Sequence, residues 1–209
     1  CTGQTLAAAG GNCTVDFYFQ PTAVGIAGGM ATITDLGAAT VGVPLSGEGV
    51  EPSQLTSTPA SGSTSWANIL VSQSGPKVTF AIKNTGGVAT NTLAVAITSA
   101  IPTDKDQFIK GADSCNTTTL TALNGAKDNC SIEITYTPSA RGSHLAAIEV
   151  QESGGGLLIV SLSGNAQAPP TITVEPTTTS DFGIVALGKT SKRSFIIGNT
   201  GDVLANAGS

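Results

Sequence analysis

Cysteine is the residue type in this sequence with the clearest chemistry. The four cysteines form two pairs of similar spacing, Cys1 with Cys13 and Cys115 with Cys130. Paired thiols can form a disulfide or bind zinc, but a zinc site needs further Cys or His ligands close by, and the chain has a single histidine. We therefore expect two disulfides, with free thiols as the alternative. A bridge across residues 116–129 would stabilise the fold by roughly 3 kcal/mol in the chain-entropy model.

The histidine, His144, is the conventional candidate for acid–base chemistry at neutral pH. It follows Gly142 at the predicted start of a strand, and the nearest carboxylates along the sequence are Glu149 and Glu152. One histidine beside bridged cysteines does not assemble a Ser–His–Asp or Cys–His arrangement. We therefore expect a solvated histidine at a strand end and no catalytic residue.

Three carboxylates, Asp104, Asp106 and Asp113, are the candidates for a metal site, because carboxylate oxygens suit Ca²⁺. Their spacing lacks the alternating Asp pattern of a dedicated calcium loop, and Lys105 lies between two of them. The glycines at 154–156 lack the lysine and the helix of a phosphate-binding loop. We expect a solvated acidic loop and a hairpin turn, with no metal and no cofactor.

Two aromatic residues, Trp66 and Tyr18, are candidates for a sugar-binding platform. Tyr18 alternates with Phe17 and Phe19, so we expect its ring to face solvent. We expect Trp66 to pack at the end of a sandwich, at the place that Phe182 takes further along the chain. For both residues we prefer a structural role, packing for Trp66 and ordinary surface exposure for Tyr18, over a role in sugar binding.

The composition limits the partners of the chain. Of its 209 residues, 40% are hydrophobic, 4% aromatic and 11% charged, and the formal net charge is −5. Ordinary soluble domains contain about 25% charged residues, so this surface has weak long-range electrostatics. An acidic chain without a basic face is a poor ligand for nucleic acid or for anionic lipid. No apolar run approaches the roughly 20 residues of a membrane span.

An internal repeat organises the chain. Residues 13–47 align without a gap with residues 130–164, at an offset of 117, and residues 80–86 align with residues 195–201 at an offset of 115. The matches keep both residue type and order, so the repeat unit is 115–117 residues long.

The repeat divides the chain into three parts. Residues 1–50 are the C-terminal part of one repeat, residues 51–167 are a complete repeat, and residues 168–209 are the N-terminal part of another. Short segments that contain proline join the parts, which is typical of semi-rigid linkers.

Alternation with a period of two predicts strands throughout the repeat. Val78, Phe80 and Ile82 alternate with polar or small residues, and residues 132–136 and 158–162 do the same between Gly, Pro and Asn turn signals. Such strands bury one face and expose the other. We expect an all-β protein made of tandem immunoglobulin-like β-sandwiches, and no segment has helical periodicity.

Several motifs resemble those of a known family. Asp181-Phe-Gly-Ile-Val-Ala-Leu-Gly188 and Phe195-Ile-Ile-Gly-Asn-Thr-Gly201, together with the Cys1…Cys13 segment and Leu45-Ser-Gly47, are similar to the bacterial choice-of-anchor D repeats. These are related to the ASPM/SPD-2/Hydin modules and to the major sperm protein. The resemblance covers essentially the whole chain and implies a secreted, surface-attached or matrix protein. The complete repeat departs from the motif, with Trp66-Ala-Asn-Ile in place of Asp-Phe-Gly-Val and three extra residues between its cysteines.

The first and last parts are complementary. Cys1 corresponds to Cys115 and Ser209 to Ala94, so together they make one repeat that lacks the equivalent of residues 95–114. Either the chain is a window onto a longer polypeptide, or the tail of one copy completes the head of the next. The missing segment favours the window. The expected partners are neighbouring repeats or head-to-tail copies of the chain.

These patterns predict a non-catalytic structural repeat of a secreted or cell-surface bacterial protein, such as a stalk, spacer or extracellular filament. The alternatives are an adhesive module that binds a glycan or a protein, and an accessory domain of a larger secreted hydrolase. An even number of cysteines in a chain with few charges suits an oxidising compartment.

Overall fold

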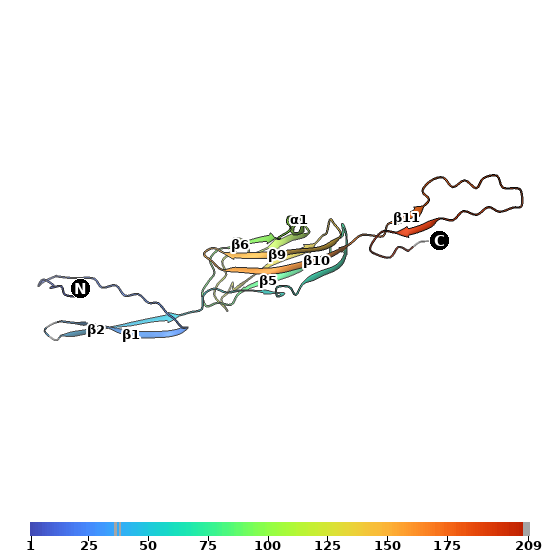
Figure 1. The fold of residues 1–209 in the computed structure, drawn as a ribbon. Helices are drawn as coiled ribbons and strands as arrows, with labels where there is room; N and C mark the ends of the chain where they lie inside the picture. Colours follow the sequence, from blue (N-terminus) through green and yellow to red (C-terminus); the bar gives the residue numbers. More distant parts are fainter. Residues whose placement is uncertain (36, 38, 207–209) are drawn as a thin grey trace. The chain divides into compact units, whose positions relative to one another are not determined.

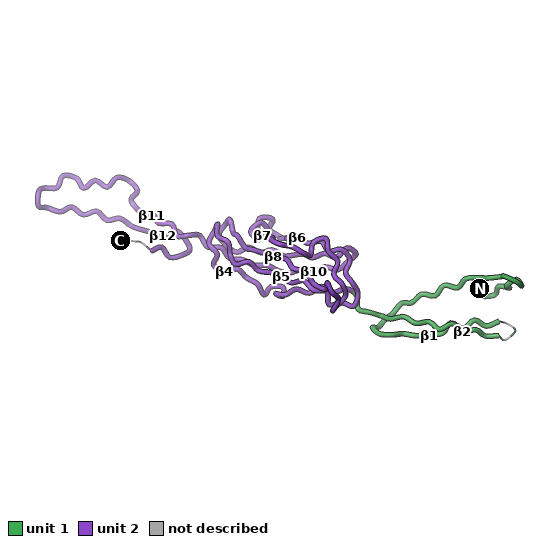
Figure 2. The backbone as a smooth tube through the Cα atoms, turned by 180° about the vertical axis from the view of Figure 1, so that it is seen from behind, with its two compact units in different colours: residues 1–52 green, residues 53–209 purple. Residues whose placement is uncertain are grey.

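The fold is built almost entirely from β-strands. A computed structural model describes residues 1–35, 37 and 39–206. The chain separates into two compact units, Cys1–Pro52 and Ser53–Ser209 (Figure 2). Within the described residues the only helix is the single turn α1 (Pro102–Lys105), and no helix there is long and apolar enough to cross a membrane.

The complete repeat forms a sandwich of two four-stranded sheets (Figure 1). The strand order is β3-β5-β8-β7 in one sheet and β4-β10-β9-β6 in the other. All pairs are antiparallel except β4 with β10, which run parallel. This is an immunoglobulin-like arrangement, as the alternation predicts. The strands are β3 (Leu55–Thr58), β4 (Ser65–Leu70), β5 (Val78–Asn84), β6 (Leu93–Thr98), β7 (Phe108–Asp113), β8 (Asn129–Tyr136), β9 (Gly142–Glu152) and β10 (Leu157–Gln167).

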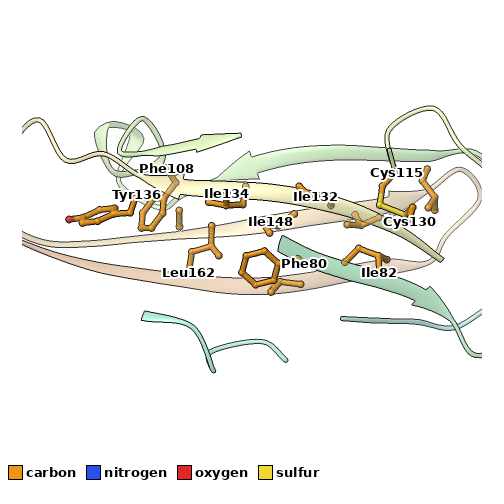
Figure 3. Close-up of a cluster of buried hydrophobic side chains, with 14 of the residues drawn as sticks. Phe80, Ile82, Phe108, Cys115, Cys130, Ile132, Ile134, Tyr136, Ile148 and Leu162 are labelled. Atoms are coloured by element: carbon orange, nitrogen blue, oxygen red, sulfur yellow. A yellow bond between two sulfur atoms is a disulfide. The ribbon is translucent and has the colours of Figure 1, made fainter. Parts of the chain in front are cut away.

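The core lies between these two sheets and follows the alternation of the sequence. On β8, Ile132, Ile134 and Tyr136 are buried while the residues between them are only partly buried. Figure 3 shows these side chains facing Ile148 and Leu162 of the opposite sheet. Each large apolar side chain that is fully buried contributes about 1.5–3 kcal/mol of transfer free energy. Burial on one face of each strand is therefore what holds the two sheets together.

Helix α1 is the element that the sequence analysis did not predict. Pro102 stands at its start, where a residue without an N–H group costs nothing. The turn is four residues long, too short for a helical hydrophobic period to be visible in the sequence. It packs against β9 and brings Asp104 into a buried position.

The N-terminal unit contains a hairpin that copies part of the central sandwich. Strand β1 (Gly25–Thr34) pairs with β2 (Thr40–Gly49), and the register runs from Gly25 opposite Gly49 to Thr34 opposite Thr40. Strands β9 and β10 have the same register at the offset of 117, from Gly142 opposite Ala166 to Gln151 opposite Leu157. The similarity in sequence is therefore also a similarity in strand pairing.

The last part of the chain forms a second, shorter hairpin, which also has a counterpart in the central sandwich. Strand β11 (Ile172–Glu175) pairs with β12 (Ile196–Asn199), with Ile172 opposite Asn199. In the central sandwich β3 pairs with β5 in the equivalent register, with Leu55 opposite Asn84. The first hairpin therefore corresponds to the C-terminal half of a sandwich, and this one corresponds to the N-terminal half.

Candidate functional site

The two cysteine pairs are bridged. Cys115 and Cys130 are buried, and their Cα atoms are 5.1 Å apart (Figure 3). This bridge ties the end of the segment after β7 to the start of β8, and the loop that it closes carries the buried Leu120. Cys1 and Cys13 have Cα atoms 5.4 Å apart, in a part of the chain that is mostly exposed. Both bridges favour an oxidising, extracytoplasmic environment.

His144 is buried, so the expectation of a solvated histidine is wrong. Its Nδ1 atom lies 2.6 Å from the Tyr136 hydroxyl, and both side chains are enclosed by the sandwich. The register of β9 places His144 on the inward face, in line with Ala146 and Ile148. Period-two alternation from Ile148 back to His144 is the signal that would have revealed this burial. Among the described residues no hydrogen bond joins this pair to a carboxylate, and Asp104 accepts one from the backbone N–H of Leu145 at 3.0 Å.

Burial has a measurable consequence for Tyr136. Burial, assisted by the negative charge of Asp104, raises the pKa of Tyr136 from 10.0 to about 12. The unfolded chain loses this proton above pH 10 while the folded chain keeps it, so the free energy of unfolding falls as the pH rises from about 10 to about 12. A difference of two pKa units corresponds to at most about 2.7 kcal/mol.

We expect Tyr136→Phe to remove this part of the alkaline loss of stability. The measurement is the urea midpoint of the wild type and of Tyr136→Phe at intervals from pH 9 to pH 12. The difference between the two proteins should shrink steadily above pH 10. Parallel curves over that range would contradict the coupling of this hydroxyl to folding.

The three carboxylates proposed as a calcium alternative do not converge. Asp104 is the buried residue of α1, Asp106 pairs with Lys105 at the surface, and Asp113 accepts a hydrogen bond from Lys110 at 2.7 Å. Burial raises the pKa of Asp113, but the hydrogen bonds from Lys110 and from two backbone N–H groups outweigh it and hold that pKa below its usual value. Across the described residues, no group of three or more His, Cys, Asp or Glu side chains is placed to hold a metal ion.

The two aromatic candidates differ in burial. Trp66 is buried on β4, with its ring centroid 5.8 Å from Phe108 and 6.2 Å from Tyr136. Its indole N–H donates to the Pro76 carbonyl at 2.7 Å. Tyr18 is exposed, but Phe17 and Phe19 beside it are about half exposed as well, so the exposure does not follow from alternation. Trp66 therefore acts as a packing residue.

Asn84 is a buried polar residue whose role the sequence analysis missed. Its side-chain oxygen accepts hydrogen bonds from the N–H groups of Gln54 and Gly86, at 3.1 and 3.0 Å. Its amide donates to the carbonyls of Val88 and Thr121, at 2.7 and 2.9 Å. A buried amide with all four bonds satisfied pins three separate chain segments to the end of β5.

Asn199 repeats this arrangement in the last part of the chain. It accepts from the N–H groups of Thr171 and Gly201, both at 3.0 Å, and donates to the Val203 carbonyl at 2.8 Å. Among the described residues, three of the four contacts of Asn84 therefore have a counterpart. The repeated Asn-Thr-Gly motif was the signal for this structural role.

The first and last parts of the chain expose residues whose counterparts form the core of the central sandwich. Phe195, the counterpart of the fully buried Phe80, is 48% exposed. Val15, the counterpart of the fully buried Ile132, is 47% exposed. The remaining exposed side chains at core-equivalent positions are Phe17, Phe19, Ile33, Val43, Leu45, Phe182 and Ile197. Exposed apolar side chains in this number are unusual for a soluble domain.

An open groove on the central sandwich is the remaining concave feature of note. It measures about 490 Å³ and is lined by residues at the end of β6, the start of α1 and the middle of β9. Its polar groups are already engaged: Thr98 donates to Glu149 at 2.7 Å, and Ser99 donates to the Leu145 carbonyl at 2.6 Å. The groove therefore offers few free polar groups to orient a ligand.

A scan against protein-family models and a search of curated proteins each found no match. Solved structures do show similarity. One is the secreted serine protease VesC from Vibrio cholerae, with 16% identity and a TM-score of 0.37 over 49% of this chain. The match covers 21% of that protein, so this chain spans about a fifth of its length.

Two other similar structures are single domains. The ASH/PapD-like domain 7 of human CEP192 is 13% identical with a TM-score of 0.36, and the match covers 54% of this chain and 84% of that domain. WR4, a C. elegans member of the MSP family, is 13% identical with a TM-score of 0.35, over 54% of this chain and 99% of that one. At such identities the similarity concerns the fold alone.

Proposed function

We propose that the chain is a non-catalytic structural repeat module of a secreted or cell-surface protein, acting as a stalk, spacer or filament wall. The observation that carries this proposal is what the repeats have in common. The first part shares a cysteine pair and a hairpin register with the central repeat, and the last part shares a second hairpin register and the Asn84-type hydrogen bonds with it. They do not share the polar pair of the sandwich, because Ala27 stands where His144 would be and Phe19 where Tyr136 would be. What repeats are packing residues and structural bonds, whereas the one pair with acid–base groups, His144 and Tyr136, does not repeat.

The path of the chain through the central sandwich suits a load-bearing role. Strand β4 lies near the start of the repeat and β10 at its end, and the two pair in parallel. The start of β4 and the end of β10 therefore lie at opposite ends of the sandwich. A force that pulls the repeat by its two ends slides these strands past each other, so that their hydrogen bonds resist together instead of opening one at a time.

The two disulfides support placing this module outside the cytoplasm. We also assign the chain to the bacterial choice-of-anchor D repeats that its motifs resemble. These repeats are one family among the proteins with an immunoglobulin-like fold.

Stretching single molecules of the chain, held by handles at its two ends, tests the structural role. We expect one discrete unfolding event for the central sandwich. The Cys115–Cys130 bridge shields a segment with a sequence separation of 15 from extension. At about 3.6 Å per residue, the length released in that event should be about 50 Å greater after reduction of the disulfide. Smooth extension without a discrete event would contradict the load-bearing proposal.

A further inference from the structure

The linker between the central sandwich and the last hairpin is bound along its length. Residues 168–171 join the end of β10 to the start of β11. Pro169 and Pro170 have no N–H group, and the proline ring fixes the backbone dihedral φ. The N–H groups of Ala168 and Thr171 are both donated to side chains at or just after the end of β12. The linker is therefore held against the hairpin that follows it.

Asp202 is the residue that holds the start of this linker. Its Oδ2 atom accepts a hydrogen bond from the Ala168 N–H group at 2.7 Å, and its own N–H group donates to the Ala168 carbonyl at 3.1 Å. Beside it, Gly201 lies so close to the linker that a Cβ atom at position 201 would overlap the Pro169 carbonyl oxygen. Both backbone polar groups of Ala168 are thus bound to one residue of the hairpin.

Arg141 reaches the same carboxylate from the central sandwich. Its Nη2 atom lies 3.1 Å from the Oδ1 atom of Asp202. The loop between β8 and β9 that carries Arg141 is fixed by the buried side chain of Gln107, whose Oε1 atom accepts from the N–H and hydroxyl groups of Ser139 at 2.6 and 3.0 Å. Asp202 therefore uses one carboxylate oxygen for the linker and the other for the sandwich.

This pair of charges is not a general feature of the repeat. At the offset of 115, Gly87 stands at the position of Asp202, and at the offset of 117, Val24 stands at the position of Arg141. The hydrogen bonds of Asn199, in contrast, are shared with Asn84. The fold of the repeat needs the asparagine and does not need the ion pair, which favours a role for the ion pair in the joint.

We propose that Arg141 and Asp202 form a latch that fixes the direction of the hairpin β11–β12 relative to the central sandwich, so that this joint is stiff. The inference rests on the proposed structural role, because a stalk or spacer keeps its reach only if its joints resist bending. The Arg141 side chain is 65% exposed and that of Asp202 is 30% exposed, so water and salt weaken the attraction. Ionic strength should therefore loosen the latch.

The test measures how far the hairpin moves independently of the sandwich in the 209-residue chain. Residual dipolar couplings, measured by NMR, give the alignment of each part, and the wild type at low salt should show one common alignment. Arg141→Gln should lower the ratio of latched to free molecules about two- to fivefold, the range for an exposed ion pair, and the alignment of the hairpin should drop below that of the sandwich. NaCl at about 1 M, where the screening length is about 3 Å, should do the same to the wild type.

Two changes at Asp202 separate the ion pair from the linker bond. Asp202→Asn keeps an oxygen that accepts from the Ala168 N–H group, so it should loosen the hairpin as Arg141→Gln does while that amide stays protected from hydrogen exchange. Asp202→Ala removes both interactions and should also speed exchange of the Ala168 amide. Lys83→Gln is the matched control, because it removes the same charge beside Asn129, the first residue of β8, whereas Arg141 follows the end of that strand. It should leave the alignment of the hairpin unchanged.

Independent alignments of hairpin and sandwich in the wild type at low salt would overturn the proposal. An unchanged alignment in Arg141→Gln or at high salt would do the same, as would an equal loss in Lys83→Gln. The discrete event in the stretching experiment depends on the strands of the central sandwich, so failure of the latch and failure of the load-bearing role are observed separately.

Discussion

Replacing Phe80 with alanine is expected to lower the free energy of unfolding of the central sandwich by about 3–5 kcal/mol. The ring is fully buried on β5 between the two sheets, where it contributes to the main cluster of core residues (Figure 3). Truncation removes the transfer free energy of the ring and leaves a cavity that the rigid strands cannot close. Urea denaturation followed by tryptophan fluorescence measures the effect, because Trp66 is buried in the same core.

Phe195→Ala is the matched control, since the same residue type stands at the equivalent position of the last hairpin. There the ring is 48% exposed, so in dilute, monomeric protein the change should cost no more than about 0.5 kcal/mol. Equal losses for Phe80→Ala and Phe195→Ala in monomeric samples would show that the last hairpin is already packed within one copy.

Removing the Cys115–Cys130 bridge by a double replacement with alanine is expected to cost the central sandwich about 2–5 kcal/mol. The bridge lowers the conformational entropy of the unfolded chain. It also anchors the loop that places Leu120 in the core and the Thr121 carbonyl beside the Asn84 amide. Without it, the unfolded chain gains the entropy of a free loop and the hydrogen bonds of Asn84 lose one of their supports. Denaturation midpoints of the oxidised wild type and of the double variant measure the difference.

The matched control is the double replacement of Cys1 and Cys13. That bridge lies outside the central sandwich, in the unit Cys1–Pro52. The unfolding of the central sandwich should therefore be unchanged. A similar loss in both double variants would mean that the N-terminal unit supports the central sandwich.

Much of the central sandwich could be predicted from residue patterns. The alternation along residues 132–136 identifies the inward face of β8. Residues that align at the offsets of 117 and 115 also have equivalent partners in the paired strands. The pattern could not reveal α1, whose single turn has no period, and the inward face of His144 was overlooked because a polar residue interrupts the apolar series there. A polar residue such as His144 is buried only where a hydrogen-bond partner such as the Tyr136 hydroxyl reaches it. That partner lies on another strand, so the pattern along one strand does not show it.

The sequence by itself determined the all-β fold, the repeat of 115–117 residues and the pairs of cysteines that could form bridges, because each depends on spacing along one chain. Only the tertiary structure decided which strands lie at the sheet edges, since sheet order depends on contacts between residues far apart in sequence. An edge strand has a single hydrogen-bonded neighbour, so a sheet can lose it and keep every other strand pair.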